Sequence, residues 1–134
     1  MPNRQIEVCP LASGSKGNSL FIGFNQEGLL IDAGLSGVEI ERRLSAVQID
    51  PSCLRAIVIT HEHSDHVKGA GVLSRRFNLP VYISEKTYSA GPDLGKLFEL
   101  HHFDCGRAFD IGPVHVTPFS ISHDAADPVG LRRG

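Results

Sequence analysis

The sequence predicts a mixed α/β fold, because patterns typical of strands and of helices alternate along its 134 residues. The clearest pattern is the continuous apolar run of residues 56–60, which is typical of a strand buried on both faces. A second is the spacing of Val38, Leu44 and Val47 among charged residues, which indicates an amphipathic helix over residues 37–47. No linker or repeat divides the chain, so we expect one domain over residues 1–134.

The other predicted elements follow from runs of apolar residues and from turn residues such as those at 25–28. In chain order they are strands over residues 6–12, 20–24, 29–31, 80–83 and 114–121, and helices over residues 67–77 and 85–97. Only a short polar turn separates the strands over residues 20–24 and 29–31, which predicts a β-hairpin. The last helix should break at Gly91 and Pro92, because a proline removes a helical hydrogen bond.

The composition is that of an ordinary globular protein. Hydrophobic residues make up 41% of the chain and charged residues 21%, and the net charge is −2. This charge argues against a simple DNA-coating role but leaves open a nuclease with a local basic groove. No apolar run approaches the ~18 residues of a membrane span. The three widely spaced cysteines fit reduced thiols better than disulfides. We therefore expect a cytoplasmic protein with no membrane partner.

A dense group of metal-ligand residue types follows the buried strand at once, namely His61, His63, Asp65 and His66. A divalent metal site needs neutral imidazoles and carboxylates that converge on one ion. His61 and His63 can point to the same side of an extended segment, and Asp65 and His66 could serve a second ion beside the first. The alternative is a solvated polar loop. The density of ligand types and their place at a strand end favour the metal site.

Such a metal site would support hydrolysis. A bound ion lowers the pKa of a water molecule toward neutrality and so supplies hydroxide, and a second ion would clamp the attacking and leaving oxygens. Asp65, or a water held by a ligand, is the expected acid/base partner. The sequence offers no Ser-His-Asp or Cys-His arrangement that would compete for the role of nucleophile.

The pattern His-x-His-x-Asp-His at residues 61–66 resembles the signature loop of the metallo-β-lactamase superfamily of hydrolases. The stretch Leu-Ile-Asp-Ala-Gly at residues 30–34 resembles a second motif of the same family. Two further segments, residues 13–19 and 122–130, are similar to its YycJ-like (WalJ-like) branch, whose nearest relatives act on nucleic acids. The resemblance covers residues 7–130.

The resemblance implies an αββα four-layer sandwich, of which this chain supplies about the N-terminal half. It also implies that His61, His63 and His123 hold a first ion, while the Asp and the last His of the loop belong to a second. By the same resemblance, Asp32 braces the metal loop. The implied cofactor is zinc, two ions per complete domain, with Mn²⁺ or Fe²⁺ as alternatives.

The activity implied is exonuclease-like hydrolysis of nucleic-acid phosphodiester bonds by a metal-bound hydroxide. An alternative of the same fold is a hydrolase of small thioesters, lactones or esters, which the acidic net charge mildly favours. The family pattern continues with a bridging Asp and a final His that this chain does not contain. A third interpretation is therefore an inactive metal-binding fragment, and we expect self-association or a complementing C-terminal half as its partner.

Some residues keep a structural interpretation beside the functional one. Asp32 taken alone fits a turn, and residues 13–19 either cradle a phosphate through backbone N–H groups or only connect two strands. We expect His101, His102 and His115 to be surface or packing residues.

Overall fold

The computed structural model describes residues 6–14, 17–61, 64–120 and 129–133, of which residues 64, 65, 119, 120 and 129–133 are described by their backbone alone. Strands and helices alternate along the chain, as the sequence predicts. In chain order the elements are β1 (Ile6–Ala12), β2 (Ser19–Phe24), β3 (Glu27–Ile31), α1 (Gly37–Ala46), the 3₁₀ turn η1 (Pro51–Cys53), β4 (Leu54–Val58), α2 (Ser64–Val67), α3 (Ala70–Phe77), β5 (Pro80–Tyr82), α4 (Glu85–Ala90), β6 (Glu99–His101), β7 (Phe109–Ile111), β8 (Val114–Ser120) and β9 (Val129–Arg133).

The first sheet has the strand order β1-β2-β3-β4-β5-β6 and changes from antiparallel to parallel pairing at β3. Along the parallel part, Ile31 lies beside Val58, Val58 beside Tyr82, and Tyr82 beside His101. Because these strands run in one direction, the residues that follow them leave the sheet at the same edge. Residues far apart in the sequence can therefore meet at this edge, which is where open α/β sheets commonly bind ligands.

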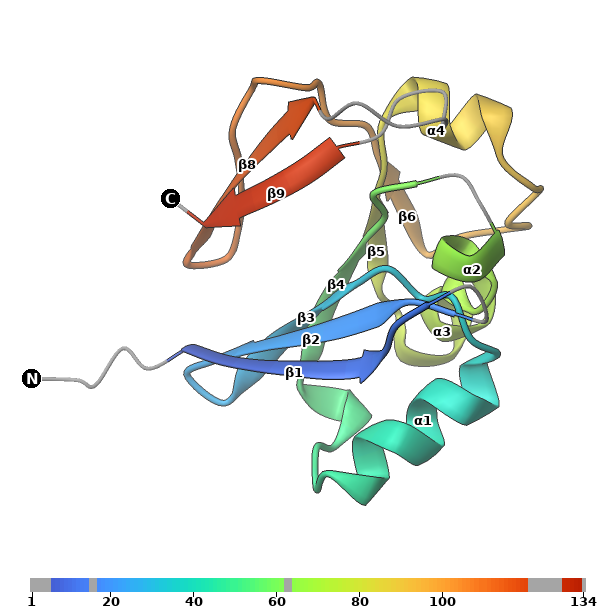
Figure 1. Cartoon of the computed structure of the whole chain (residues 1–134), viewed down its shortest axis with the longest axis vertical. Helices are drawn as coiled ribbons and strands as arrows, with labels where there is room; N and C mark the ends of the chain where they lie inside the picture. The colour runs from blue at the N-terminus through green and yellow to red at the C-terminus, as the bar shows by residue number, and fades with distance from the viewer. Residues whose placement is uncertain (1–5, 15–16, 62–63, 121–128, 134) are drawn as a thin grey trace, which may run out of the picture.

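Two hydrophobic cores divide the molecule into layers (Figure 1). The first core lies between the helices and the first sheet, where Leu44 of α1 and Leu73 of α3 belong to the same cluster as Ile57 of β4. The second lies between this sheet and the antiparallel sheet β7-β8-β9, where Val58 of β4 clusters with Val116 of β8. Ile57 and Val58 are neighbours that serve opposite cores, as the alternation of side chains along a strand requires. The resulting helix, sheet and sheet layers confirm the predicted α/β fold.

The helix predicted over residues 67–77 is in fact broken, since α2 ends at Val67 and α3 begins at Ala70. Gly69 stands at the break, and its N–H donates to the carbonyl oxygen of Ala33 at 2.6 Å. A Cβ atom at Gly69 would lie only 2.3 Å from the carbonyl oxygen of Leu35. The close approach of two backbone segments therefore interrupts the helix and demands a glycine.

The helix predicted over residues 85–97 was wrong beyond Ala90, where α4 ends. A loop follows, and the Arg75 guanidinium donates to the carbonyl oxygens of Leu94 and Lys96 at 3.2 and 2.9 Å. The chain then forms β6, which pairs with β5 and was not predicted. Pro92 has no N–H to continue the helix, and the side chain of Arg75 supplies part of the hydrogen bonding of this loop.

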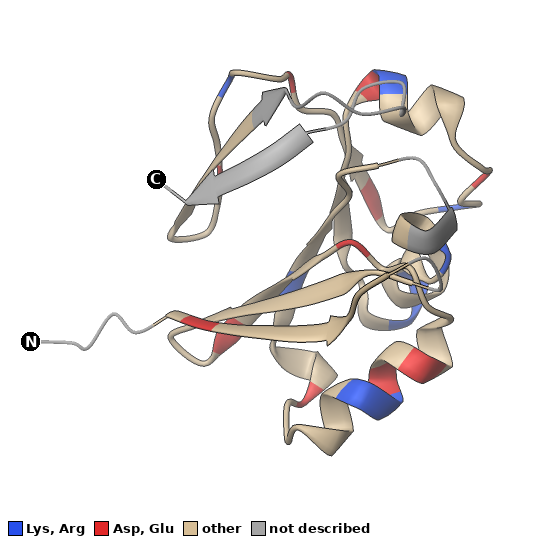
Figure 2. Ribbon diagram, viewed as in Figure 1, with Lys and Arg blue, Asp and Glu red and all other residues tan. Residues whose placement is uncertain are grey.

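Acidic and basic residues are mixed on the helical surface instead of gathering in a patch of one sign (Figure 2). On α1, Glu39 pairs with Arg42 and Arg43, and Glu41 pairs with Arg76 of α3 at 3.0 Å. Within the residues that the structure describes, no helix is long and apolar enough to cross a membrane.

Candidate metal centre

Three ligand-type side chains meet at the carboxyl edge of the first sheet. Asp32 follows β3, His61 comes shortly after β4, and His66 lies in α2. Each offers one ligand atom, and these atoms all lie within 4.8 Å of one another. The His61 and His66 rings are 4.4 Å apart between centroids. The parallel pairing of β3 with β4 brings the two strand ends together, and the turn into α2 brings the third side chain beside them.

Hydrogen bonds to the backbone of Asp32 and Ala33 connect β2, β4 and α2 around the cluster. The Asp32 N–H donates to the Val58 carbonyl at 2.7 Å, and the Ala33 N–H donates to the His66 carbonyl, also at 2.7 Å. The hydroxyl of Ser19 donates to the Asp32 carbonyl at 2.8 Å. Asp32 has a φ of +63°, a left-handed conformation that aspartate adopts more readily than most residues. This departure from the strand directs the chain across the end of β4.

The carboxylate of Asp32 accepts three hydrogen bonds. Its Oδ1 accepts from the N–H of Thr60 at 2.7 Å, and its Oδ2 accepts from the hydroxyl of Thr60 at 2.5 Å. Oδ2 also lies 2.8 Å from Nδ1 of His66. Asp32 is only 6% exposed, and a buried carboxylate needs such partners. Both oxygens are thus engaged with protein groups.

The composition of the cluster suits a divalent ion. Two imidazoles and a carboxylate are donors that zinc, manganese and iron accept. His61 is 8% exposed and Asp32 is 6% exposed, so the donors lie at the rim of the protein interior and not on an open surface. Imidazoles whose Nδ1 atoms are held by a hydroxyl or a carboxylate are typical of metal ligands in proteins.

Comparison with known proteins bears on this arrangement. The family model described as the metallo-beta-lactamase superfamily matches residues 12–130 of the chain. This chain belongs to the metallo-β-lactamase superfamily. The predicted family is thereby confirmed.

Two curated proteins are more specifically similar to this chain. An exodeoxyribonuclease YycJ of Bacillus anthracis is 43% identical over 122 residues, which are 89% of this chain and 46% of that protein. An exodeoxyribonuclease WalJ of Streptococcus pneumoniae is 43% identical over 123 residues, which are 88% of this chain and 46% of that protein. The chain therefore spans about half the length of the curated relatives it matches.

A solved structure supports the fold. The Rm3 metallo-beta-lactamase is 24% identical and superposes with a TM-score of 0.77, over 94% of this chain and 53% of that protein. This likeness shows that the chain has the fold of about half of a metallo-β-lactamase.

The structure brings together two of the predicted ligands, His61 and His66, with Asp32, which was predicted to brace the metal loop. The backbone of Asp65 lies in α2, and its side chain lies outside the described residues, as do His63 and His123 altogether. The roles assigned to these three residues remain predictions from the superfamily resemblance.

The histidines predicted to be structural have partners away from the cluster. His101 Nε2 lies 2.9 Å from Glu99, and His102 Nδ1 lies 3.0 Å from the Ile83 carbonyl. His115 Nδ1 lies 2.7 Å from Asp110 in the second sheet. These contacts agree with surface and packing roles.

Sequence reasoning missed two residues that contact the cluster, Ser19 and Thr60. Both are buried, and both hydrogen-bond to Asp32. Thr60 was expected only as the end of an apolar strand, and Ser19 only as the end of a small-residue loop. A buried hydroxyl directly before a ligand histidine is the one signal that could have pointed to Thr60.

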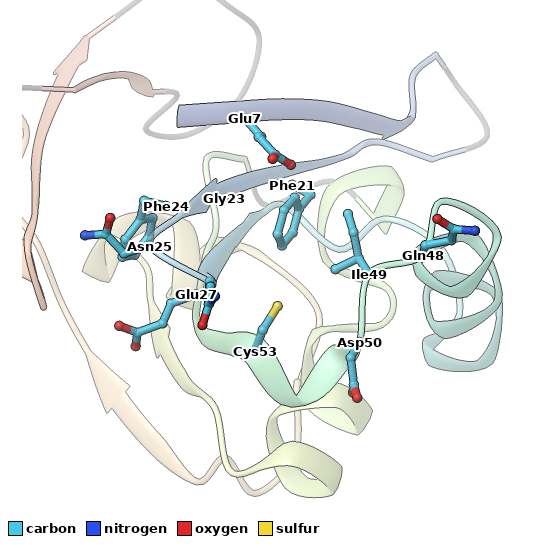
Figure 3. Close-up of a pocket in the computed structure, with 11 residues that line it drawn as sticks. Glu7, Phe21, Gly23, Phe24, Asn25, Glu27, Gln48, Ile49, Asp50 and Cys53 are labelled. Atoms are coloured by element: carbon cyan, nitrogen blue, oxygen red, sulfur yellow. The ribbon is translucent and has the colours of Figure 1, made fainter. Parts of the chain in front are cut away.

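A hollow of about 270 Å³ lies at the opposite end of the same strands (Figure 3). Its lining includes Phe21, Glu27 and Cys53, which belong to the hairpin and to the turn before β4. None of the clustered ligand residues lines it. The hollow is therefore separate from the candidate metal centre of the superfamily fold.

Proposed function

We propose that this chain forms the metal-binding half of a metal-dependent nuclease that removes nucleotides from the ends of DNA. The observation that carries the proposal is the cluster of Asp32, His61 and His66 at the carboxyl edge of the sheet. The identity of 43% to two exodeoxyribonucleases supports the choice of DNA as the substrate.

We assign the residues by function as follows. His61 and His63, with His123, hold a first ion, and Asp65 with His66 contributes to a second. Asp32 holds the metal loop in place, since both of its oxygens already accept hydrogen bonds from Thr60 and His66. We propose zinc as the metal, with manganese or iron as the alternatives. None of the three cysteines forms a disulfide bond, which supports a cytoplasmic location.

The chemistry follows from these assignments. A divalent ion supplies Lewis acidity toward a phosphate oxygen and a nucleophile at neutral pH. Asp65 would hold or release a proton beside the scissile bond. Asp32 would keep the two imidazole rings oriented while the substrate binds. The exposed side chain of Lys68, two residues after His66, would offer a positive charge to the DNA backbone.

The test compares substrates on the metal-reconstituted chain. Single-stranded DNA labelled at either end and a panel of small acyl esters and thioesters would be incubated with the wild type and with His61→Ala and His63→Ala. We expect progressive shortening of DNA by the wild type alone. Hydrolysis of the small esters in preference to DNA would overturn the proposed substrate. A chain that binds metal and cleaves nothing would overturn the proposed activity and leave an inactive metal-binding fragment.

A further inference from the structure

The hydroxyl of Thr60 lies between the carboxylate of Asp32 and the ring of His61. Its Oγ1 is 2.5 Å from Oδ2 of Asp32 and 2.8 Å from Nδ1 of His61. The backbone N–H of the same residue donates to Oδ1 of Asp32 at 2.7 Å. Thr60 is 7% exposed, so these contacts are made in the protein interior. One side chain therefore joins two residues that follow different strands, β3 and β4.

The direction of each hydrogen bond follows from the number of protons. A carboxylate only accepts, and a hydroxyl has a single proton to give. The proton of Thr60 goes to Asp32, so its oxygen can only accept from His61, and His61 must carry a proton on Nδ1. The same reasoning applies to His66, whose Nδ1 lies 2.8 Å from Oδ2 of Asp32. Both rings then have their lone pair on Nε2.

We propose that Thr60 is a positioning residue for the metal centre, whose hydroxyl fixes the tautomer and the orientation of His61. The hydroxyl connects the carboxylate of Asp32 to the ring of His61, whereas the same carboxylate contacts the ring of His66 directly. The inference rests on the proposed metal role of His61. It goes beyond that role because it states which nitrogen meets the ion and which residue decides it.

The side chain of threonine suits this role. Its branched Cβ restricts rotation about χ1, which limits the directions that the hydroxyl can take two residues after the end of β4. Valine has nearly the same shape and lacks the hydroxyl, whereas serine keeps the hydroxyl and lacks the methyl group. A merely structural role, filling space at the strand end, would be served by valine better than by serine. A positioning role requires the opposite order.

The experiment compares Thr60→Val with Thr60→Ser in the full chain. Long-range ¹H–¹⁵N correlation spectra of the metal-free protein report which nitrogen of His61 carries the proton. Zinc affinity is measured by competition with a chromophoric chelator. We expect the Nδ1–H tautomer in the wild type and in Thr60→Ser, and mixed tautomers in Thr60→Val. Zinc affinity should fall roughly 10- to 100-fold in Thr60→Val, the range typical for lost partners of ligand histidines, and much less in Thr60→Ser.

Several results would overturn the proposal. One is a folded Thr60→Val with the wild-type tautomer and zinc affinity, and another is a larger loss of affinity in Thr60→Ser than in Thr60→Val. Should Thr60→Val fail to fold, the wild-type spectrum decides, because a proton on Nε2 of His61 contradicts the inference by itself. A wild type that binds no zinc would overturn the proposed function, while the tautomers of the metal-free chain still decide the role of Thr60.

Discussion

At the carboxyl end of β3 and β4, buried polar side chains contact one another, whereas at the amino end the side chains surround an open hollow (Figure 3). Asp32, Thr60 and His66 are linked by hydrogen bonds of 2.5 to 2.8 Å. At the other end, the sulfur of Cys53 and the ring of Phe21 face the hollow, and Glu27 pairs with Arg55 at its margin.

This difference shows that the hollow and the candidate metal centre are two separate features at opposite ends of the same strands. Burying polar groups is costly unless each has a partner, so a buried network of this kind specifies one arrangement of its side chains. The hollow imposes no comparable requirement on the residues that line it. Changes at the carboxyl end should therefore affect both metal binding and folding, and changes at the amino end should affect neither strongly.

The largest effect should come from Asp32→Ala. Removing this carboxylate leaves the N–H and hydroxyl of Thr60 and the Nδ1 of His66 without their acceptor, at a cost of about 3 kcal/mol in the free energy of unfolding. The matched control is Asp50→Ala, since Asp50 is exposed and caps the turn before β4 through the N–H of Ser52. Its loss should cost about 1 kcal/mol or less. Urea unfolding measures both variants, and equal costs would contradict the comparison.

The next largest effects on stability should come from replacing a glycine near each end of β3 and β4. In Gly69→Ala the new Cβ meets the Leu35 carbonyl oxygen at 2.3 Å, and a backbone atom cannot move aside easily. We expect a loss of about 2 kcal/mol. In Gly28→Ala the Cβ meets the edge of the Phe21 ring at 2.3 Å and the Ile22 carbonyl oxygen only at 3.2 Å, so the closest obstacle is a side chain that borders the hollow and not the backbone. Thermal and urea unfolding should rank Gly69→Ala as clearly worse, and the reverse order would break the contrast.

The thiol of Cys53 offers a smaller test at the amino end. Burial raises the pKa of Cys53, and the nearby charge of Asp50 raises it further. Less thiolate is then present at pH 8 than in an ordinary cysteine, so alkylation should be slower. The rate of reaction with iodoacetamide would be followed against pH in a Cys9→Ser/Cys105→Ser background. Asp50→Asn should lower the midpoint, and neither it nor Cys53→Ser should alter zinc affinity. If the pH midpoint of alkylation equals that of an ordinary cysteine, the thiol of Cys53 is not shielded from water by the hollow.

Glu39 lies on the surface of α1, outside the candidate metal centre and the hollow at the two ends of β3 and β4, and a change there should have the smallest effect on stability. Hydrogen bonds from Arg42 and then Arg43 lower its pKa from the ordinary 4.5 to about 2. Its contribution to stability is therefore present above pH 4.5 and is lost as the pH falls toward 2. Carboxyl ¹³C titration of Glu39 should show a midpoint near 2 that rises in Arg42→Ala. A midpoint near 4.5 in the wild type would mean that these ion pairs do not persist in solution.

Local patterns predicted the long elements, and contacts between distant residues account for what was missed. The apolar run that became β4 and the amphipathic pattern that became α1 carry their own signal. Glu99–His101 has no such signal and becomes a strand because it pairs with β5. The break at Gly69 depends on the backbone of residues 33–37, which nothing in residues 67–77 reveals.

At the candidate site too, local patterns predicted some residues, whereas others depend on contacts between distant parts of the chain. His61 and His66 stand out as a dense motif, and Asp32 was assigned by resemblance to the superfamily. The contact of Asp32 with Thr60 spans 28 positions and that with His66 spans 34, so the interlocking of these residues follows only from the parallel pairing of β3 with β4. A hydroxyl between two functional groups has no sequence pattern of its own.

The central claim is that the carboxyl end of the sheet, and not the hollow, holds a divalent ion. Zinc titration by chelator competition on the wild type, His61→Ala and Cys53→Ser tests it most directly. The account predicts wild-type affinity in Cys53→Ser and a loss of about 100-fold or more in His61→Ala, beyond the range typical for residues that only support a ligand. Equal zinc affinity in the wild type and His61→Ala would contradict it.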